Sequence, residues 1–345
     1  ETNEVVISNE AKAETNEVAI SNEAQAETNE VVITHGRIDR GSRRRERLDA
    51  LPPLVADASL SRELELPQAG FSLRPIRQDG PTNDRKLFAG LAALFTVEKA
   101  SDLAKGRDVR ESGDYNGLLP ARMWQVQSFL NCNYTMARQW MQWKSKNRSD
   151  LNINEEPNNL SKYYDGIPLS RDTSINEAFL LHGTRPDTVL PILANGLNER
   201  FSGGMWGQGT YLGENCEKID QYCTMDDGTD TAVHQHLFTE HCTNPGSLYY
   251  AFVCRVLLGQ SVHTKDGSES LDGGQVYART DIATRGRELA SIPESSPPEH
   301  YHSLVVELGG KVFRHREFVV FHSDLILPEF LVAYHRTKDG EIVTD

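Results

Sequence analysis

The sequence predicts an α+β fold in which short antiparallel strands carry the core, preceded by a disordered N-terminal tail. From residue 175 onward, short apolar runs are separated by long irregular loops and few helices, which is typical of α+β domains and not of repeated βαβ units. Residues 1–36 instead repeat the acidic unit ETNEVVISNEAKA, which has no aromatic residue and little to bury. With 345 residues, 38% of them hydrophobic and 25% charged, the chain can hold one large globular domain or two small ones.

The first eighty residues are predicted to be tail and linker, and the folded domain is predicted over residues 81–340. The acidic repeat is expected to be disordered, with a weakly helical or strand-pairing tract as the alternative. Residues 37–49, RIDRGSRRRERLD, are either a nuclear-import signal or a solvated linker. Five prolines then interrupt the chain up to residue 81.

Charge and cysteine content narrow the class of protein. A net charge of −14 argues against a general nucleic-acid binder, so direct nucleic-acid binding is not expected. There is no apolar run long enough for a membrane span and no signal-peptide pattern, although Glu1 in place of Met suggests that sequence is missing upstream. Five cysteines, an odd number spread along the chain, fit a reducing intracellular compartment, nuclear and/or cytoplasmic.

Two long helices are predicted before residue 150. Residues 87–104 are rich in alanine and leucine, and residues 122–144 place apolar side chains on one helical face, so we interpret the second as a packing helix. Its apolar face is formed by Val126, Phe129, Leu130, Ala137, Trp140 and Met141.

Short strands dominate the remainder. An apolar run at residues 178–181 ends in His182-Gly183-Thr184, and a short helix that stops at Gly196 follows. After a strand at 248–258, a long loop without predicted structure leads to three more strands. These are residues 302–308, 317–321 and 330–335.

Residues 203–223, GGMWGQGTYLGENCEKIDQYC, are the most unusual stretch. Their five glycines let the backbone approach a flat ligand closely, and Tyr211 and Tyr222 offer two aromatic faces. Asn215 is a candidate N-cap for a helix over residues 216–222. The glycines precede the strand and lack the G-x-G-x-x-G spacing, which excludes a dinucleotide-binding Rossmann site. An ordinary glycine-rich surface loop remains an alternative interpretation of this stretch.

Three residues at predicted strand ends are candidates for catalysis: His182, Tyr211 and Glu317. Taken singly, a histidine after a strand is usually a loop or core residue, and a tyrosine beside glycines is usually a packing residue. Glu317 is more unusual because it opens the apolar strand FVVF, and burying a carboxylate is costly unless the carboxylate has partners or a task.

Four strings, LLHGT, GGMWGQGTYLGENCEKIDQY, YHSLVVELGG and REFVVFHSDLILPEFLVAY, together resemble the poly(ADP-ribose) polymerase (PARP) catalytic domain in order and spacing. They look most like the tankyrase-like branch of that family. The resemblance is dense over residues 176–336, the core of the predicted domain. It is thinner over 110–175, where LPARMWQVQSFLNCNY resembles the helix that precedes the family's His-Gly motif.

The resemblance implies the ADP-ribosyltransferase fold, two small antiparallel β-sheets around an NAD⁺ cleft. It implies that His182 and Thr184 contact a ribose, that Gly183 pairs its backbone with the nicotinamide amide, and that Tyr211 and Tyr222 sandwich the nicotinamide ring. Glu317 would be the catalytic glutamate, completing a triad with His182 and Tyr211. NAD⁺ would be the co-substrate, and acceptor proteins, with the chain itself among the candidates, would be the partners.

This sequence departs from the family pattern in two places. Ile219 stands where the family often has a serine that contacts the nicotinamide amide, so nicotinamide affinity is in doubt. The tankyrase branch also binds zinc through a compact Cys/His cluster, and no C-x-x-C pair organises the candidates here, so zinc is not expected. Those candidates are Cys223, His234, His236, His241 and Cys242.

The leading hypothesis is therefore an NAD⁺-dependent protein ADP-ribosyltransferase. The resemblance implies that a glutamate at position 317 permits elongation to poly(ADP-ribose) without requiring it. One alternative is a catalytically silent module that binds NAD⁺ or ADP-ribose. Another is a scaffold whose working part is the acidic repeat.

Overall fold

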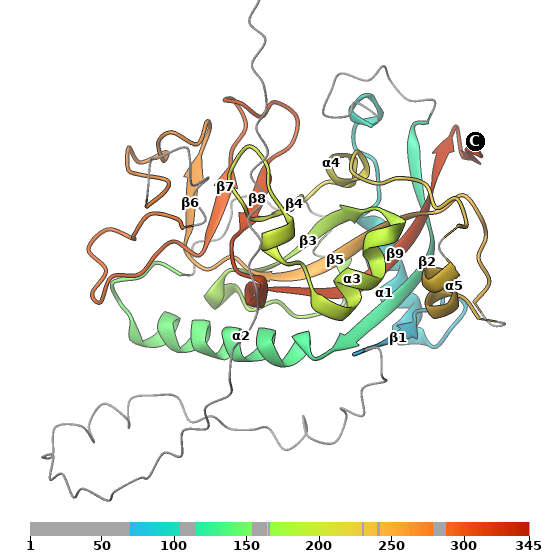
Figure 1. The fold of residues 1–345 in the computed structure, drawn as a ribbon, viewed down its shortest axis with the longest axis horizontal. Helices are drawn as coiled ribbons and strands as arrows, with labels where there is room; N and C mark the ends of the chain where they lie inside the picture. The colour runs from blue at the N-terminus through green and yellow to red at the C-terminus, as the bar shows by residue number, and fades with distance from the viewer. Residues whose placement is uncertain are drawn as a thin grey trace, which may run out of the picture. The chain divides into compact units, whose positions relative to one another are not determined.

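The computed structural model describes residues 70–103, 115–153, 164, 166–229, 231–239, 242–278 and 288–344. All of them belong to one unit of the chain, Pro52–Asp345, whose core is built on two β-sheets (Figure 1). The acidic repeat and the basic patch lie outside the described residues, so the disorder predicted for them stays a prediction.

The larger sheet has six strands, and its central strands come from distant parts of the chain. Every pair in it is antiparallel, and β3 is buried on both faces: Ala178 and Leu180 pack into one core cluster, Phe179 and Leu181 into another. A continuous apolar run is what such a strand requires. The strand order is β1 (Phe71–Pro75), β2 (Gly117–Ser128), β9 (Ile326–Lys338), β5 (Tyr249–Leu257) and β3 (Glu177–Thr184), with β10 (Glu341–Ile342) paired to β9.

The smaller sheet has four strands and is joined to the larger one by a bridge at Leu181 and Gly213. Leu181 of β3 exchanges two backbone hydrogen bonds with Gly213, of 2.8 and 2.9 Å, which places the end of β3 beside β4. The pairs are antiparallel except for β6 with β7, which is parallel. The strand order is β4 (Thr210–Leu212), β8 (Glu317–Val320), β7 (Ser303–Val306) and β6 (Ser261–Thr264).

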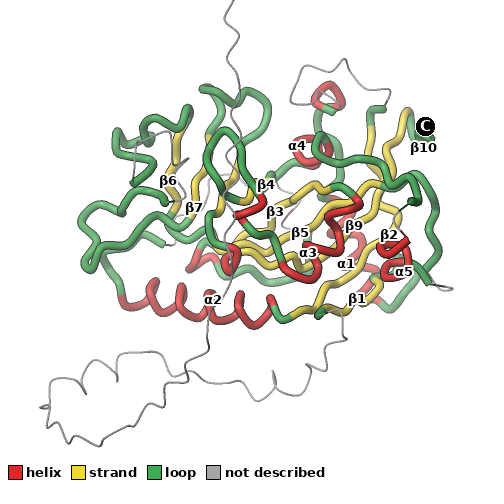
Figure 2. The backbone as a smooth tube through the Cα atoms, viewed as in Figure 1, coloured by secondary structure: helices red, strands yellow, loops and turns green. Residues whose placement is uncertain are grey.

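Helices cover both faces of the larger sheet, as Figure 2 shows in red around the yellow strands. Helices α3 (Pro186–Asn195) and α5 (Thr231–Leu237) pack on one face, and α1 (Thr82–Ala93) and α4 (Cys216–Asp220) on the other. Helix α2 (Leu130–Asn147) packs through Tyr134 and Met141 against a separate cluster. Four 3₁₀ turns complete the described part: Ala100–Asp102, Thr173–Ile175, Glu199–Phe201 and Ser323–Leu325. Within the described residues, no helix combines the length and the apolar character that crossing a membrane would require.

The α+β class and the largely antiparallel pairing predicted from the sequence are confirmed. Strands β3, β5, β7 and β8, at residues 177–184, 249–257, 303–306 and 317–320, lie where the apolar runs predicted them. Helix α3 ends at Gly196, whose φ of 76° is a backbone conformation that favours glycine. Asn215 precedes α4 as predicted, but its side chain makes no capping hydrogen bond and the helix ends at Asp220.

The helix predicted over residues 122–144 is wrong in its first third. Residues 117–128 form strand β2, and α2 begins only at Leu130. The segment is a strand because β2 pairs on both sides, with β1 and β9, and alternately buries Trp124, Val126 and Ser128. This pairing overrides the helical spacing of the apolar residues, and Phe129 and Trp140 of the predicted apolar face are exposed.

Two further segments contain strands that the sequence did not predict. Strand β1 falls in the predicted linker, so the sheet begins before residue 81. Strand β6 falls in the predicted loop after β5 and pairs with β7. Both are edge strands, and a short edge strand has a weaker apolar pattern because only one neighbour and one face constrain it.

Candidate active site

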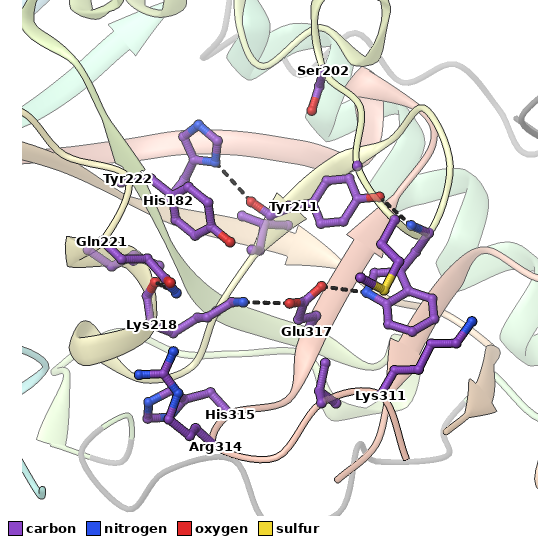
Figure 3. Close-up of a pocket in the computed structure, with 18 of the residues that line it drawn as sticks. His182, Ser202, Tyr211, Lys218, Gln221, Tyr222, Lys311, Arg314, His315 and Glu317 are labelled. Atoms are coloured by element: carbon purple, nitrogen blue, oxygen red, sulfur yellow. Dashed lines mark hydrogen bonds and ion pairs between the residues drawn. The ribbon is translucent and has the colours of Figure 1, made fainter. Parts of the chain in front are cut away.

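A cavity of about 540 Å³ opens where the smaller sheet meets the end of β3 (Figure 3). Five of the six site residues predicted from the sequence line it: His182, Gly183, Tyr211, Tyr222 and Glu317. They are far apart in sequence, and both sheets and α4 bring them together. The other lining residues are Ser202, Gly203, Gly204, Met205, Trp206, Leu212, Gly213, Lys218, Ile219, Gln221, Lys311, Val312, Phe313, Arg314 and His315.

His182 is held in one tautomer by the neighbouring sheet. Its Nδ1 lies 2.9 Å from the backbone oxygen of Tyr211. A carbonyl oxygen can only accept, so Nδ1 carries the hydrogen and Nε2 is left as a hydrogen-bond acceptor. Burial lowers the pKa of His182, which keeps the ring neutral at pH 7.

Gly183 is needed for close packing between β3 and α4. A Cβ at this position would lie 2.2 Å from the Ile219 oxygen and 2.8 Å from Cys223 Sγ, so no other residue fits without displacing α4. Thr184, by contrast, does not line the cavity. It is buried, and its hydroxyl is hydrogen-bonded to that of Thr188 on α3. The ribose contact that the resemblance implies for Thr184 stays a prediction.

Tyr211 lies on β4 with its hydroxyl enclosed by the glycine-rich loop. The hydroxyl accepts from the Trp206 N–H at 2.8 Å and donates to the Gly207 oxygen at 2.9 Å. Burial raises the pKa of Tyr211, so the hydroxyl stays neutral. A Cβ on Gly204 would lie 2.7 Å from the ring, which explains glycine there. Tyr222 lines the same cavity and is 40% exposed, leaving ring surface available to a ligand.

Glu317 begins β8, the strand between β4 and β7, so it does not lie at a sheet edge. Its carboxylate has a donor on each oxygen: Lys218 Nζ lies 2.5 Å from Oε1, and Trp206 Nε1 donates to Oε2 at 2.6 Å. Figure 3 draws both contacts as dashed lines. The side chain is only 13% exposed. The two partners therefore hold the carboxylate in place at the cavity wall.

The start of β8 is fixed by a second ion pair. Arg316 forms a bidentate pair with Glu214, with distances of 2.8 and 2.9 Å between the nitrogens and the carboxylate oxygens. Glu214 follows the Gly213 bridge, so this pair fastens β8 to the segment between β4 and α4. The position of Glu317 relative to Lys218 and Tyr211 is set by these neighbours.

The sequence did not predict the remaining parts of the cavity wall. Trp206 and Lys218 belong to the glycine-rich stretch, but the sequence did not indicate that they contact Glu317. They are 111 and 99 positions away from it in the chain. The segment 311–315 also lines the cavity. In the sequence, the feature that could have indicated this is that the segment directly precedes Glu317. Within that segment, His315 lies with Nε2 3.8 Å from Asp102 Oδ2, and burial lowers its pKa.

The zinc candidates are dispersed as far as the structure describes them. Cys223 is buried, with Sγ against the Ile219 and Tyr250 oxygens, and His234 Nε2 lies 2.7 Å from Asp226 Oδ2. His241 lies outside the described residues. Among the residues that are described, no group of three or more His, Cys, Asp or Glu side chains is placed to hold a metal ion.

Comparison with known proteins identifies the fold family. Residues 147–336, more than half of the chain, match the family "Poly(ADP-ribose) polymerase catalytic domain". A poly [ADP-ribose] polymerase-like protein, 100L of Invertebrate iridescent virus 6, is 34% identical over 94 residues, which cover 25% of this chain and 48% of the viral protein. The mono-ADP-ribosyltransferase PARP11 of Mus musculus is 24% identical over 181 residues, covering 49% of this chain and 44% of that protein.

PARP11 of Homo sapiens is also 24% identical over 181 residues, 49% of this chain and 43% of that protein. The chain thus spans less than half the length of the curated relatives that it matches. None of these relatives is a tankyrase, and the tankyrase-like branch stays a prediction. The cavity lies within the matched residues, and the chain belongs to the PARP catalytic-domain family.

Proposed function

We propose that this chain is an NAD⁺-dependent protein ADP-ribosyltransferase, which cleaves the bond between nicotinamide and ribose and transfers ADP-ribose to protein side chains. The observation that carries the proposal is the convergence of His182, Tyr211 and Glu317 on one cavity. Family membership supports the reaction class, and the positions of these three residues support turnover by this chain in particular.

The cavity walls fit the nicotinamide end of NAD⁺. At about 540 Å³ the cavity has the size of a small-molecule site, and Tyr211 and Tyr222 supply aromatic surface for a flat ring. Gly183 brings the backbone of β3 to the cavity wall, where it can pair with an amide. His182 Nε2, left as an acceptor, suits a ribose hydroxyl.

Glu317 supplies the charge that the chemistry needs. When the bond to nicotinamide breaks, positive charge develops on the ribose, and a fixed carboxylate that accepts from the ribose 2′-hydroxyl stabilises it. The acceptor side chain then forms the new bond to the ribose carbon, and its proton passes to Glu317 or to water. Because Glu317 is held on both oxygens, it requires little reorganisation at that moment.

The length of the product is the finer part of the proposal. The mouse and human relatives are named mono-ADP-ribosyltransferases, whereas the viral relative is named polymerase-like. We include elongation in the proposal because a carboxylate at Glu317 can activate the ribose hydroxyl of a previous unit. The proposed partners are acceptor proteins, the chain itself among them. The proposed location is inside the cell, nuclear and/or cytoplasmic, which suits five free cysteines.

One experiment separates this proposal from the silent-module alternative. The purified chain is incubated with NAD⁺, nicotinamide release is measured, and the intact mass of the protein is recorded. We expect nicotinamide release together with added ADP-ribose units, whose number gives the product length. NAD⁺ binding without release would support the silent module, and neither binding nor release would refute both.

A further inference from the structure

Trp206 contacts two members of the proposed triad through different atoms. Its backbone N–H donates to the Tyr211 hydroxyl at 2.8 Å, and its indole N–H donates to Glu317 Oε2 at 2.6 Å. The residue therefore connects Tyr211 on β4 with Glu317 on β8. Nothing in the sequence pattern or the family comparison assigns it a role.

The indole ring is held rigidly. Trp206 is 2% exposed and belongs to the core cluster on the outer face of the smaller sheet. The Tyr277 hydroxyl donates to its backbone oxygen at 2.8 Å. Gly267, with a φ of +80°, lies so close that a Cβ there would be 3.0 Å from the indole ring. The indole N–H is therefore aimed at Glu317 by packing on several sides.

Lys218, on the other carboxylate oxygen, is a different kind of partner. It is a cation on a flexible stem, and its ammonium also lies 5.5 Å from the centre of the Tyr222 ring. The indole N–H is a neutral donor, so it fixes direction without cancelling the negative charge. This neutrality matters because Glu317 must keep its charge to stabilise a cationic ribose.

We propose that Trp206 is a positioning residue that holds Oε2 of Glu317, so that Oε1 and the carboxylate charge face the ribose subsite. The inference rests on the proposed function. Two rotatable side-chain bonds separate the Glu317 carboxylate from its Cβ, and a fixed donor on Oε2 removes much of that freedom before substrate arrives. Lys218 then remains the exchangeable partner on the side where the ribose hydroxyl binds.

The test removes the indole N–H in two ways, one that replaces the bicyclic ring and one that keeps its shape. Trp206→Phe is compared with a protein carrying 3-benzothienylalanine at position 206, an isostere in which sulfur replaces the N–H. Single-turnover rate, the KM for NAD⁺ and the melting temperature are measured for both. Trp124→Phe, a change at a tryptophan buried in the core outside the cavity, is the control for losing an indole. We expect the isostere to melt near the wild-type temperature with a transfer rate about tenfold to a hundredfold lower and a KM changed less than threefold.

A double-mutant cycle with Glu317→Gln makes the test specific to the carboxylate. If Trp206 acts through Glu317, removing the N–H should cost little more once the charge is gone, and the double variant should be about as slow as Glu317→Gln alone. A structural role would give additive losses. Trp124→Phe should lower the melting temperature while the rate per folded molecule stays at the wild-type value.

The outcomes separate the two proposals. A wild-type chain that releases no nicotinamide refutes the proposed function and this inference with it. An active wild type with an equally active isostere overturns the role of Trp206 alone. An isostere that melts far below the wild type makes the N–H a folding contact and also overturns it.

Discussion

At the scale of single residues, a catalytic and a structural role of Glu317 predict opposite effects of the substitution Glu317→Gln. If it stabilises charge in the transition state, Glu317→Gln should lower single-turnover transfer about a hundredfold to a thousandfold, which corresponds to roughly 3–4 kcal/mol. Elongation should suffer more than attachment of the first unit, because the acceptor there is a ribose hydroxyl that must be activated.

Glu329→Gln is a matched control for this prediction. Glu329 pairs with Arg255 outside the cavity and is 13% exposed, as Glu317 is. Both substitutions remove one carboxylate from a largely buried ion pair and should lower the melting temperature by similar amounts. Only Glu317→Gln should slow transfer. If Glu317→Gln melts early but transfers at the normal rate, the glutamate is structural.

A second residue-scale prediction concerns Ile219. Its side chain is 3% exposed and packs among the buried residues beneath α4, and Ile219 also lines the cavity. Ile219→Ser should strengthen inhibition by nicotinamide, since it restores the hydroxyl that the family often places there. It should also lower stability by about 2–4 kcal/mol, because apolar contact is lost in a buried position. Inhibition curves and chemical denaturation measure the two effects.

Ile219→Val is the control for the second effect. It removes one methylene and adds no polar group, so stability should fall by about 1 kcal/mol and nicotinamide inhibition should not change. If Ile219→Ser leaves inhibition unchanged, the hydroxyl at this position does not reach nicotinamide.

The sequence was informative about residues whose chemistry appears in a short local string. His182, Tyr211, Tyr222 and Glu317 could be predicted, and all four line the cavity. The contact of Trp206 with Glu317 could not, because it depends on how the glycine-rich loop folds onto a strand 111 positions away. Thr184 lies outside the cavity lining, and its hydroxyl is hydrogen-bonded to that of Thr188.

At the scale of elements, strand β2 marks where local pattern and tertiary pairing disagree. Val126, Phe129 and Leu130 do have helical spacing, but β2 lies between two strands that supply hydrogen bonds on both sides. Strands β5 and β8 were predictable because they lie in sheet interiors and read as apolar runs. Strand β3 ends the larger sheet but is buried on both faces, so it too reads as an apolar run. Edge strands β1 and β6 lack that signal.

An element-scale prediction concerns the contact between α2 and the segment before β7. His302 Nε2, 3.5 Å from Oε1, and the ammonium of Lys144 lower the pKa of Glu299 to about 2, although partial burial opposes this shift. A carboxyl whose pKa is depressed on folding stabilises the protein above its unfolded pKa and loses that effect as pH falls toward the folded pKa. The contribution of Glu299 should therefore be complete above about pH 5 and disappear toward pH 2.

Melting curves of the wild type and Glu299→Gln, recorded over a range of pH, measure the contribution of Glu299 to stability. The variant should melt lower at pH 6, and the gap should narrow steadily below pH 5. Glu341→Gln, a change at an exposed carboxylate on β10, is the control for substitution itself. A gap that does not vary with pH would mean that the Glu299 side chain stabilises the protein through packing and not through its charge.

At the scale of the whole molecule, the boundary of the folded domain can be tested by two truncations. Removing residues 1–69 should leave transfer within about twofold of the intact chain, because every described element remains. Removing residues 1–80 also deletes β1, with buried Phe71, and the buried Ile76 that follows it. Burial of two such side chains stabilises a protein by about 3–6 kcal/mol, so the shorter chain should melt well below the longer one.

The activity and the melting temperature of the two truncated chains show where the folded domain begins and whether transfer needs the acidic repeat. If removal of residues 1–69 abolishes transfer, the acidic repeat is part of the working protein and the scaffold hypothesis gains support. If the two truncations melt alike, β1 contributes nothing to the sheet.

The position of β9 has a consequence for how the protein is made. This strand is the last long one in the chain, yet it lies in the middle of the larger sheet, between β2 and β5. Similarly, β8 lies between β4 and β7. During synthesis, neither sheet can close until residues 317–338, which contain β8 and β9, have left the ribosome, and until then β2 and β5 lack the strand that lies between them. A chain that stops before residue 317 lacks both the strand between β4 and β7 and the strand between β2 and β5, so both of its sheets stay open.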